Sequence, residues 1–187
     1  PTAVTLATPN RMIFDEINML FKNKNFRLYF SKDIIGCQLG GAIKNIYAIA
    51  AGITMGLNLG ENAKSALIAR SYVEISRLGK VLKAKPETLF GLSGLGDLVL
   101  TCNSLKSRNT TFGNLIASQQ QISIEEHLKS QETTEGYFTV KAVKKIAEEN
   151  KIIMPIMEAI YNILYNHRSI TDEIKKLLDR PATDEFY

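Results

Sequence analysis

The chain has 187 residues, of which 45% are hydrophobic and 22% are charged. This composition supplies enough apolar side chains for a globular core, and 12 glycines and 5 prolines exclude a collagen-like or low-complexity chain. The 23 basic and 19 acidic residues are mixed along the chain, so the net charge of +4 is too weak a bias to predict nucleic-acid binding.

Residues 1–35 have the pattern of a strand, a helix and a second strand. Residues 1–7 and 26–30 alternate and are rich in β-forming types. Between them, Asn10 can cap a helix whose apolar residues recur at intervals of about three and four. A β-α-β unit of this size cannot bury both faces of its sheet, so we expect it to be the C-terminal remnant of a larger α/β domain. The first residue is Pro1 rather than Met, which also favours a fragment of a longer protein.

Residues 36–187 are predicted to form a second domain that is all-helical. Residues 39–57 are apolar or small on nearly every side, which is typical of a buried helix. The uncharged stretch over residues 45–60 has 16 residues and is interrupted by Gly and Asn, whereas a membrane span needs about 20 apolar residues. No membrane span is therefore predicted.

An amphipathic helix is predicted over residues 63–83. We place four of its charged residues outside the apolar stripe, on the solvent side: Arg70, Glu74, Arg77 and Lys80. Residues 86–96 are predicted to be a glycine-punctuated connection, followed by a short apolar run over 98–100. Further helices are predicted over residues 108–118, 139–149, 155–165 and 171–178.

Lys44 lies within the helix that is predicted to be buried. A lysine there must pair with an acid, extend past small neighbours to solvent, or lose its proton. A lysine that faces a cavity can transfer protons to a ligand, whereas one that extends to solvent is structural. The residues around Lys44 leave both interpretations open. Asn45, beside it, could fix a hydrogen bond.

Three glycines precede Asp97 in the segment GLSGLG, residues 91–96. The spacing GxxGxG differs from the GxGxxG of dinucleotide-binding turns, and no clear strand precedes it, so the segment is a weak candidate for a phosphate-binding loop. Asp97 is either a helix cap or a buried carboxylate held for a cation. The local sequence favours the cap, because Asp is among the preferred capping residues.

Ser107, Arg108 and Asn109 open a predicted helix. Free N–H groups at a helix start, an Arg fork and hydroxyl or amide side chains can together bind a phosphate or a carboxylate. The alternative is ordinary capping by Ser107, with Arg108 in solvent. The local sequence does not separate the two.

The cysteines and histidines of the sequence do not indicate a metal site or a disulfide bond. Cys37 and Cys102 form no CxxC pair, and two histidines cannot provide a histidine-based metal site, so no metal is expected. Cys102 adjoins apolar residues and is predicted to lie in the core. The low cysteine content and the lack of a recognisable secretory signal favour a reduced, cytoplasmic protein.

In this order, the segments resemble one family, the bacterial-type NAD(P)-dependent glycerol-3-phosphate dehydrogenases. The resemblance rests on PTAVTLA at residues 1–7, GGAIKN at 40–45, GENAKSALIAR at 60–70, GLSGLGDLVLTC at 91–102 and SRNTTFG at 107–113. It implies a mostly α, multi-helical substrate-binding domain over residues 36–187, similar to the C-terminal domain of 6-phosphogluconate dehydrogenase. A β-α-β remnant of a Rossmann domain over residues 1–35 would precede it.

The resemblance also implies roles for single residues. Lys44 matches the catalytic lysine of the family, the acid/base for the C2 oxygen of the substrate. Residues at positions that contact glycerol 3-phosphate are Lys44, Asn45, Asp97, Thr101, Ser107, Arg108 and Asn109. Arg108 is also expected near the cofactor, which Thr133 and Glu135 would touch from the helical domain.

The implied reaction interconverts dihydroxyacetone phosphate and sn-glycerol 3-phosphate for glycerophospholipid synthesis, with NAD(P)H as the cofactor and no metal. The GxGxxG turn and a second active-site lysine of the family are absent from these residues, so we expect the chain alone to bind the cofactor poorly and to be inactive. The expected partner is a small phosphorylated substrate. A homodimer is left open.

Two alternatives remain open from the sequence. Another two-domain ketoacid or hydroxyacid reductase, such as a relative of 2-ketopantoate reductase, would also carry a lysine in its helical domain. The segment Ser107-Arg108-Asn109 argues instead for a phosphorylated substrate. A non-catalytic helical scaffold would leave Lys44 extended to solvent, and would not bring Lys44, Asp97 and Arg108 to one wall.

Overall fold

The computed structural model describes residues 1–118, 124, 134–182 and 184–185. Its first elements are β1 (Thr2–Ala7), α1 (Arg11–Phe21) and β2 (Phe26–Ser31). The two strands are parallel, and their register runs from Thr2 opposite Phe26 to Ala7 opposite Ser31. The predicted β-α-β arrangement of this region is therefore confirmed.

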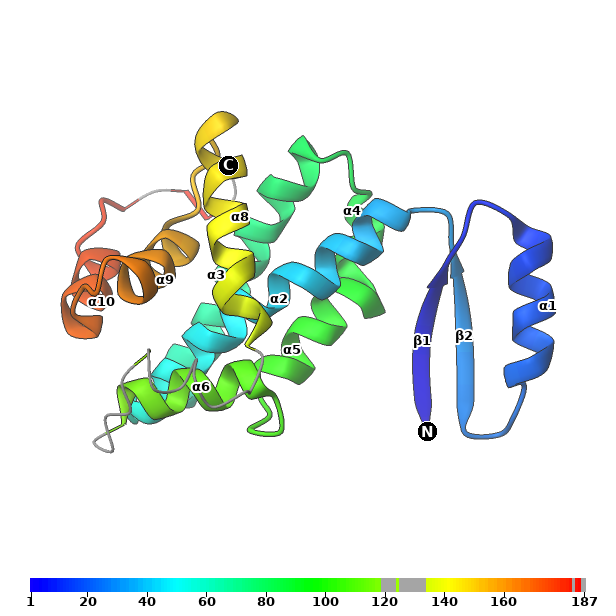
Figure 1. Cartoon of the computed structure of the whole chain (residues 1–187), viewed down its shortest axis with the longest axis horizontal. Helices are drawn as coiled ribbons and strands as arrows, with labels where there is room; N and C mark the ends of the chain where they lie inside the picture. The colour runs from blue at the N-terminus through cyan, green and yellow to red at the C-terminus, as the bar shows by residue number, and fades with distance from the viewer. Residues whose placement is uncertain (119–123, 125–133, 183, 186–187) are drawn as a thin grey trace.

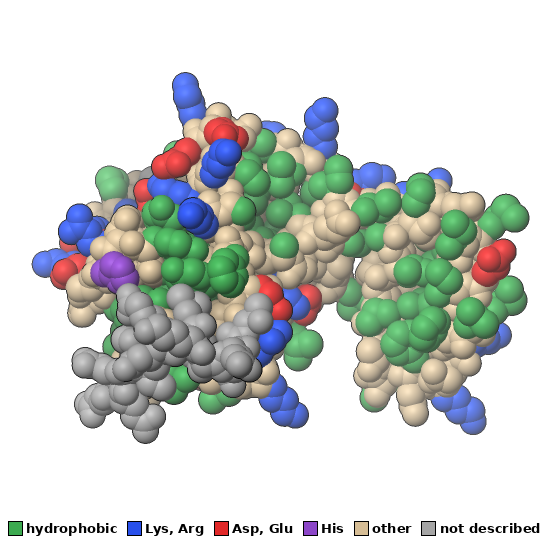
Figure 2. All heavy atoms as spheres, in the orientation of Figure 1, with side chains coloured by type: hydrophobic (Ala, Val, Ile, Leu, Met, Phe, Trp, Pro, Cys, Tyr) green, Lys and Arg blue, Asp and Glu red, His purple; other side chains and the backbone are tan. Residues whose placement is uncertain are grey.

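The β-α-β unit buries few of its own apolar residues. Phe14 is buried, and its ring centroid lies 5.1 Å from that of Phe30. Five apolar side chains of α1 are exposed: Met12, Ile13, Met19, Leu20 and Phe21. Figure 2 shows apolar side chains gathered on this unit, which lies at one end of the molecule, beside the remaining helices. Two strands and one helix leave this surface uncovered, because a sheet needs more strands or a second layer to bury it.

The helical unit is built around α2 (Ile34–Gly56), as Figure 1 shows. The fully buried residues of α2 include Ile43, Ile46, Tyr47 and Ile49. By length and composition alone α2 could cross a membrane, but half of its most apolar window is buried inside the protein. This burial is expected of the core helix of a globular domain. The helix begins five residues before its predicted start, where Asp33 caps it by accepting a hydrogen bond from the Gly36 N–H.

Five further helices pack around α2 or against its neighbours. They are α3 (Gly60–Val81), α6 (Arg108–Ala117), α8 (Glu135–Glu149), α9 (Pro155–Tyr165) and α10 (Ile170–Leu178). The contact between α2 and α6 is close enough that a Cβ at Gly113 would lie 2.0 Å from the carbonyl oxygen of Ile49. The prediction for α9 is confirmed at both ends, whereas α8 begins four residues earlier than predicted.

The prediction of a connection over residues 86–96 is wrong. The segment forms α4 (Pro86–Phe90) and one π-helical turn, η1 (Leu92–Gly96), and continues directly into α5 (Asp97–Cys102). In η1 the Gly96 N–H donates to the Gly91 carbonyl oxygen at 3.1 Å. The glycines widen the helical turn here instead of ending the helix, which sequence spacing alone does not distinguish.

Glu74 is the clearest error in the predicted surface of α3. It is only 2% exposed, and its carboxylate accepts hydrogen bonds from the N–H groups of Ile156, at 2.7 Å, and Met157, at 3.1 Å. The Tyr47 hydroxyl donates a third hydrogen bond, at 3.1 Å. Glu74 thus joins α3 to the start of α9 and to α2. Burial raises its pKa to about 7, against the opposite effect of the hydrogen bonds.

Candidate functional site

Lys44 and Asp97 form an ion pair between α2 and the start of α5. The Lys44 Nζ lies 2.5 Å from the Asp97 Oδ2, and the two side chains are 21% and 30% exposed. Lys44 therefore pairs with an acid, which is one of the three outcomes that the sequence leaves open. The partial exposure of both groups means that a ligand can reach the pair. The prediction that Asp97 is a helix cap is wrong, since Gly96 occupies that position and no side chain caps α5.

Thr101 lies next to Asp97, one turn further along α5. Its hydroxyl lies 2.6 Å from the Asp97 carbonyl oxygen, to which it donates, and 3.4 Å from Oδ1 of the same residue. The carbonyl oxygen of Thr101 in turn accepts a hydrogen bond from the Thr110 hydroxyl on α6, at 2.8 Å. The Thr101 hydroxyl thus lies beside the Asp97 carboxylate, whose Oδ2 pairs with Lys44.

The start of α6 is fixed beside Lys44 by Asn109. Ser107 caps this helix, which is one of the two alternatives that the sequence leaves open, and accepts a hydrogen bond from the Thr110 N–H at 3.3 Å. Asn109 is 3% exposed, and its amide donates to the Asn45 Oδ1 at 3.1 Å and to the Glu135 Oε2 at 3.3 Å. Because Asn45 is the neighbour of Lys44 on α2, these bonds bring the first turn of α6 next to the Lys44–Asp97 pair.

Arg108 and Glu135 form a second ion pair at the edge of this wall. The Arg108 Nη2 lies 2.9 Å from the Glu135 Oε1, and both side chains are about half exposed. A guanidinium carries five N–H donors, so one bond to a carboxylate leaves capacity for an anionic ligand. Glu135, predicted to touch the cofactor, here contacts the two residues predicted to bind phosphate. Thr133, the other predicted cofactor contact, lies outside the described residues.

Gly136 is a member of this network that the sequence did not reveal. Its N–H donates to the Asn109 Oδ1 at 2.9 Å, so the Asn109 amide oxygen also has a partner. The predicted helix starts at residue 139, whereas α8 starts at Glu135, and N–H groups in a first helical turn are free to bind a side chain. A predicted helix start at residue 135 instead of 139 would have indicated that the Gly136 N–H is free to donate to a side chain.

Cys102 does not have the surroundings of a reactive thiol. Cys102 is fully buried, and burial raises its pKa to about 12 despite the charges of Lys44 and Lys64. The prediction that Cys102 lies in the core is confirmed. Within the described part of the chain, there is no group of three or more His, Cys, Asp or Glu residues that could hold a metal ion.

The predicted site residues thus meet along two short hydrogen-bonded chains. One runs from Lys44 to Asp97 and Thr101, and the other from Asn45 through Asn109 to Glu135 and Arg108. The chains are joined where Lys44 and Asn45 are adjacent on α2. An amine next to a carboxylate, with a guanidinium and a helix start beside them, can donate a proton and bind an anion at the same time.

Comparison with known proteins identifies relatives over the whole chain. Residues 33–175 match the family described as "NAD-dependent glycerol-3-phosphate dehydrogenase C-terminus". The chain is 45% identical over 189 residues to the glycerol-3-phosphate dehydrogenase (NAD(P)+) of Bartonella henselae, and 44% identical over 187 residues to that of Bacillus pumilus. Both matches cover 100% of this chain but only 55% and 54% of the relatives, so the chain spans about half the length of these curated relatives.

A solved structure is similar over nearly the whole of this chain and, like the sequence relatives, extends well beyond the matched part. The crystal structure of glycerol-3-phosphate dehydrogenase from Coxiella burnetii matches with a TM-score of 0.89 and 39% sequence identity. The match covers 96% of this chain and 55% of that chain. Both units of the fold, the β-α-β unit and the helices, therefore have counterparts in a known structure.

Proposed function

This chain belongs to the NAD-dependent glycerol-3-phosphate dehydrogenase family, and we propose that it forms the substrate-binding wall of an enzyme that interconverts dihydroxyacetone phosphate and sn-glycerol 3-phosphate. The observation that carries the proposal is the Lys44–Asp97 pair, part-exposed beside the start of α6. The family match favours this function over the ketoacid or hydroxyacid reductase alternative. The proximity of Lys44, Asp97 and Arg108 argues against a non-catalytic scaffold.

Lys44 is assigned the proton transfer. A bound nicotinamide cofactor would supply the hydride to C2 of the substrate as NAD(P)H, or take it from C2 as NAD(P)+. As C2 is reduced, its oxygen gains negative charge, and the Lys44 ammonium stabilises that charge and donates a proton to the oxygen. In the opposite direction, the neutral amine accepts the proton. Asp97 keeps the Lys44 Nζ at a fixed position during both steps.

Arg108 and the first turn of α6 are assigned the phosphate of the substrate. Arg108 has exposed guanidinium surface, and the start of a helix provides N–H donors and positive electrostatic potential. Asn109 is nearly buried and its amide already has three partners, so its role is to hold α6 against α2. The phosphate is remote from C2, and binding it at Arg108 and α6 aligns the reacting carbon with Lys44.

Among the described residues, we assign contact with the cofactor to the ion pair of Arg108 and Glu135. Arg108 and Glu135 are half exposed, which fits contact with the polar groups of a dinucleotide but cannot enclose one. We therefore assign most cofactor binding to an additional α/β segment that would cover the exposed apolar face of β1, β2 and α1. A cytoplasmic location, a homodimer and a role in glycerophospholipid synthesis follow from the family resemblance and stay predictions.

A chimaera tests the proposal directly. The part of the Coxiella burnetii protein that precedes the matched region is joined to residue 1, and oxidation of NADH and NADPH is followed with dihydroxyacetone phosphate as the substrate. The proposal predicts substrate-dependent oxidation by the chimaera and none by the 187-residue chain alone. A chimaera that folds and shows no such activity, with either cofactor, contradicts the proposal.

A further inference from the structure

The glycine-rich turn η1 packs directly against the helix that carries Lys44. A Cβ at Gly40 of α2 would lie 2.1 Å from the carbonyl oxygen of Ser93 and 3.0 Å from the Cα of Gly94. Both of these are backbone atoms, so no rotation of a side chain could make room for a methyl group. The main chains of α2 and η1 are therefore in contact at this point.

This contact is in register with the Lys44–Asp97 pair. Gly40 and Lys44 are four residues apart on α2, so they lie on the same face of the helix. Ser93 and Asp97 are also four residues apart, along η1 and into α5. The backbone contact thus lies one turn before the ion pair on both elements. Any outward shift of η1 would carry Asp97 away from Lys44.

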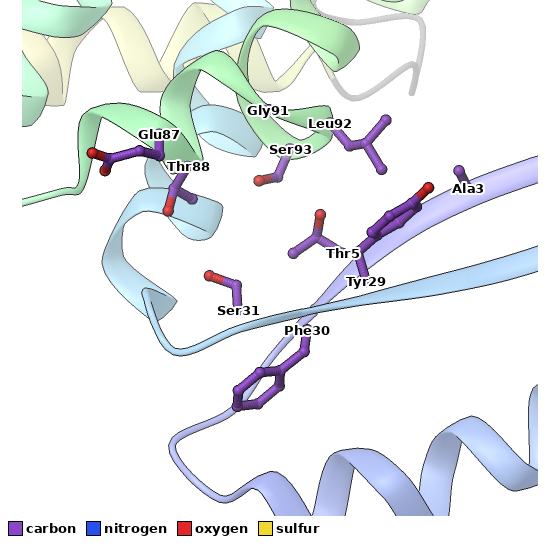
Figure 3. Close-up of a pocket in the computed structure, with 10 residues that line it drawn as sticks. All are labelled: Ala3, Thr5, Tyr29, Phe30, Ser31, Glu87, Thr88, Gly91, Leu92 and Ser93. Atoms are coloured by element: carbon purple, nitrogen blue, oxygen red, sulfur yellow. The ribbon is translucent and has the colours of Figure 1, made fainter.

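The surroundings of η1 show which side fixes its position. Gly91, Leu92 and Ser93 form one wall of a cavity of about 410 Å³, whose opposite wall includes Thr5 of β1 and Tyr29 of β2 (Figure 3). On the strand side there is therefore room, whereas on the α2 side there is none. A turn with space on one side only is positioned by the crowded side.

A side-chain contact reinforces the same packing. The Ser93 hydroxyl donates to the Cys37 Sγ at 3.4 Å, one turn of α2 before Gly40. The π-helical turn then runs into α5 without a capping side chain, so the direction of the Asp97 side chain depends on the backbone of η1. Two links thus join η1 to α2 immediately before Asp97.

We propose that Gly40 is a positioning residue, whose lack of a side chain lets η1 approach α2 closely enough to hold Asp97 against Lys44. The catalytic consequence of this arrangement rests on the proposed function. The pairing itself does not, and it can be tested on the 187-residue chain without any turnover.

The test measures how fast Lys44 reacts with a limiting amount of an amine-reactive reagent, read by mass spectrometry of its peptide. The charge-assisted hydrogen bond to Asp97 holds the Lys44 amine in place and restricts the approach of the reagent. Gly40→Ala should therefore raise the rate at Lys44 at least about threefold, close to the rate in Asp97→Asn. Gly41→Ala is the matched control, because a Cβ there would meet no atom within 4 Å, and its rate should equal that of the wild type.

The reaction rate at Lys64 shows whether the substitution has only loosened the packing of the helices. Its side chain is 8% exposed, so its rate rises only if the helices separate. An unchanged Lys44 rate in Gly40→Ala, or a parallel rise at Lys44 and Lys64, would overturn the proposal. If circular dichroism shows that Gly40→Ala does not fold, Ser93→Ala is used for the same test. It removes only the hydroxyl that reaches Cys37, and it should raise the Lys44 rate without changing that of Lys64.

The chimaera separates this proposal from the proposed function. There, Gly40→Ala should lower kcat about tenfold and leave KM within about twofold, because the phosphate site is untouched. A changed Lys44 rate with normal kcat would support the positioning and contradict the catalytic role of the pair. An unchanged Lys44 rate contradicts the positioning, whatever the turnover.

Discussion

The Arg108 guanidinium lies 2.9 Å from the carboxylate of Glu135, a residue 27 positions further along the chain. The arginine that we assign to the phosphate of the substrate is thus already paired with a carboxylate of the same chain. A phosphate that binds Arg108 must share the guanidinium with this carboxylate or displace it. Because both side chains are about half exposed, water screens their attraction and the pair contributes little to stability.

Glu135→Gln should therefore strengthen anion binding. Removing the negative charge leaves Arg108 with its full charge toward a phosphate, and we expect the Kd of the chain for glycerol 3-phosphate to fall about two- to fivefold. Titration followed by NMR of the chain measures this affinity. Glu149→Gln is the control, since Glu149 pairs with Lys145 at 3.9 Å on α8 and should leave the Kd unchanged. Weaker binding in Glu135→Gln would contradict this account.

Arg108→Ala should mainly affect substrate binding. In the chimaera we expect KM for dihydroxyacetone phosphate to rise at least about tenfold, with a smaller change in kcat, because the fork binds a group remote from C2. Arg108→Lys should recover only part of this loss, since an ammonium cannot form the paired bonds of a guanidinium. Steady-state kinetics at varied substrate concentrations checks both variants. An unchanged KM in Arg108→Ala would remove Arg108 from the phosphate site.

Asn109 should matter for stability as well as for the site. Asn109→Ala leaves the Gly136 N–H and the Asn45 Oδ1 without their partner, which should cost about 1–3 kcal/mol of the free energy of unfolding. Urea denaturation of the chain measures the change. Asn103→Ala is the matched control: Asn103 is exposed and its amide bonds only the Val99 carbonyl oxygen among the described contacts. Equal effects of the two substitutions would contradict the assigned role.

Glu74 should make stability depend on pH. Its pKa in the folded chain, about 7, is above the ordinary value of 4.5, so the folded state holds this proton more tightly than the unfolded state does. The resulting stabilisation is complete below about pH 4.5 and is lost as the pH rises through about 7, by on the order of 3 kcal/mol. The pKa of Asp33 is lowered instead, so its contribution changes only at more acidic pH.

Urea midpoints between about pH 5 and about pH 8 test this effect. We expect Glu74→Gln to have a flatter profile than the wild type, because a glutamine has no proton to lose. Glu61→Gln is the control, since the Glu61 side chain is 86% exposed and should keep the wild-type profile. Parallel profiles for Glu74→Gln and the wild type would show that Glu74 does not titrate in this range.

Local sequence patterns predicted most of the helices but not the contacts between them. Pro155 marks the first turn of α9, and the apolar spacing of α1 follows its Asn10 cap, so these elements could be predicted from neighbouring residues. The Lys44–Asp97 pair joins residues 53 positions apart, and the spacing of charges carries no information on such a contact. Only the family resemblance indicated that the two residues belong to one site.

Two errors concern acidic residues whose surroundings the local sequence pattern did not reveal. Glu74 was placed in solvent because it is charged, yet the free N–H groups at the start of α9 provide partners for a buried carboxylate. Asp97 was predicted to be a cap because Asp is among the preferred capping residues, yet the glycines before it form η1 and Gly96 occupies the cap position. The partners of Glu74 come from an element distant in sequence, which a local pattern cannot reveal. For Asp97, glycine spacing alone does not distinguish a π-helical turn from a connection.

The most direct test of the central claim is the turnover of the chimaera with Lys44→Met. Methionine fills a similar volume but cannot donate a proton, so kcat for dihydroxyacetone phosphate should fall at least about a thousandfold, while the melting temperature stays close to that of the parent. Lys80→Met, at an exposed position of α3, should retain full turnover. A Lys44→Met chimaera that keeps near-normal kcat would contradict the assignment of the proton transfer to Lys44.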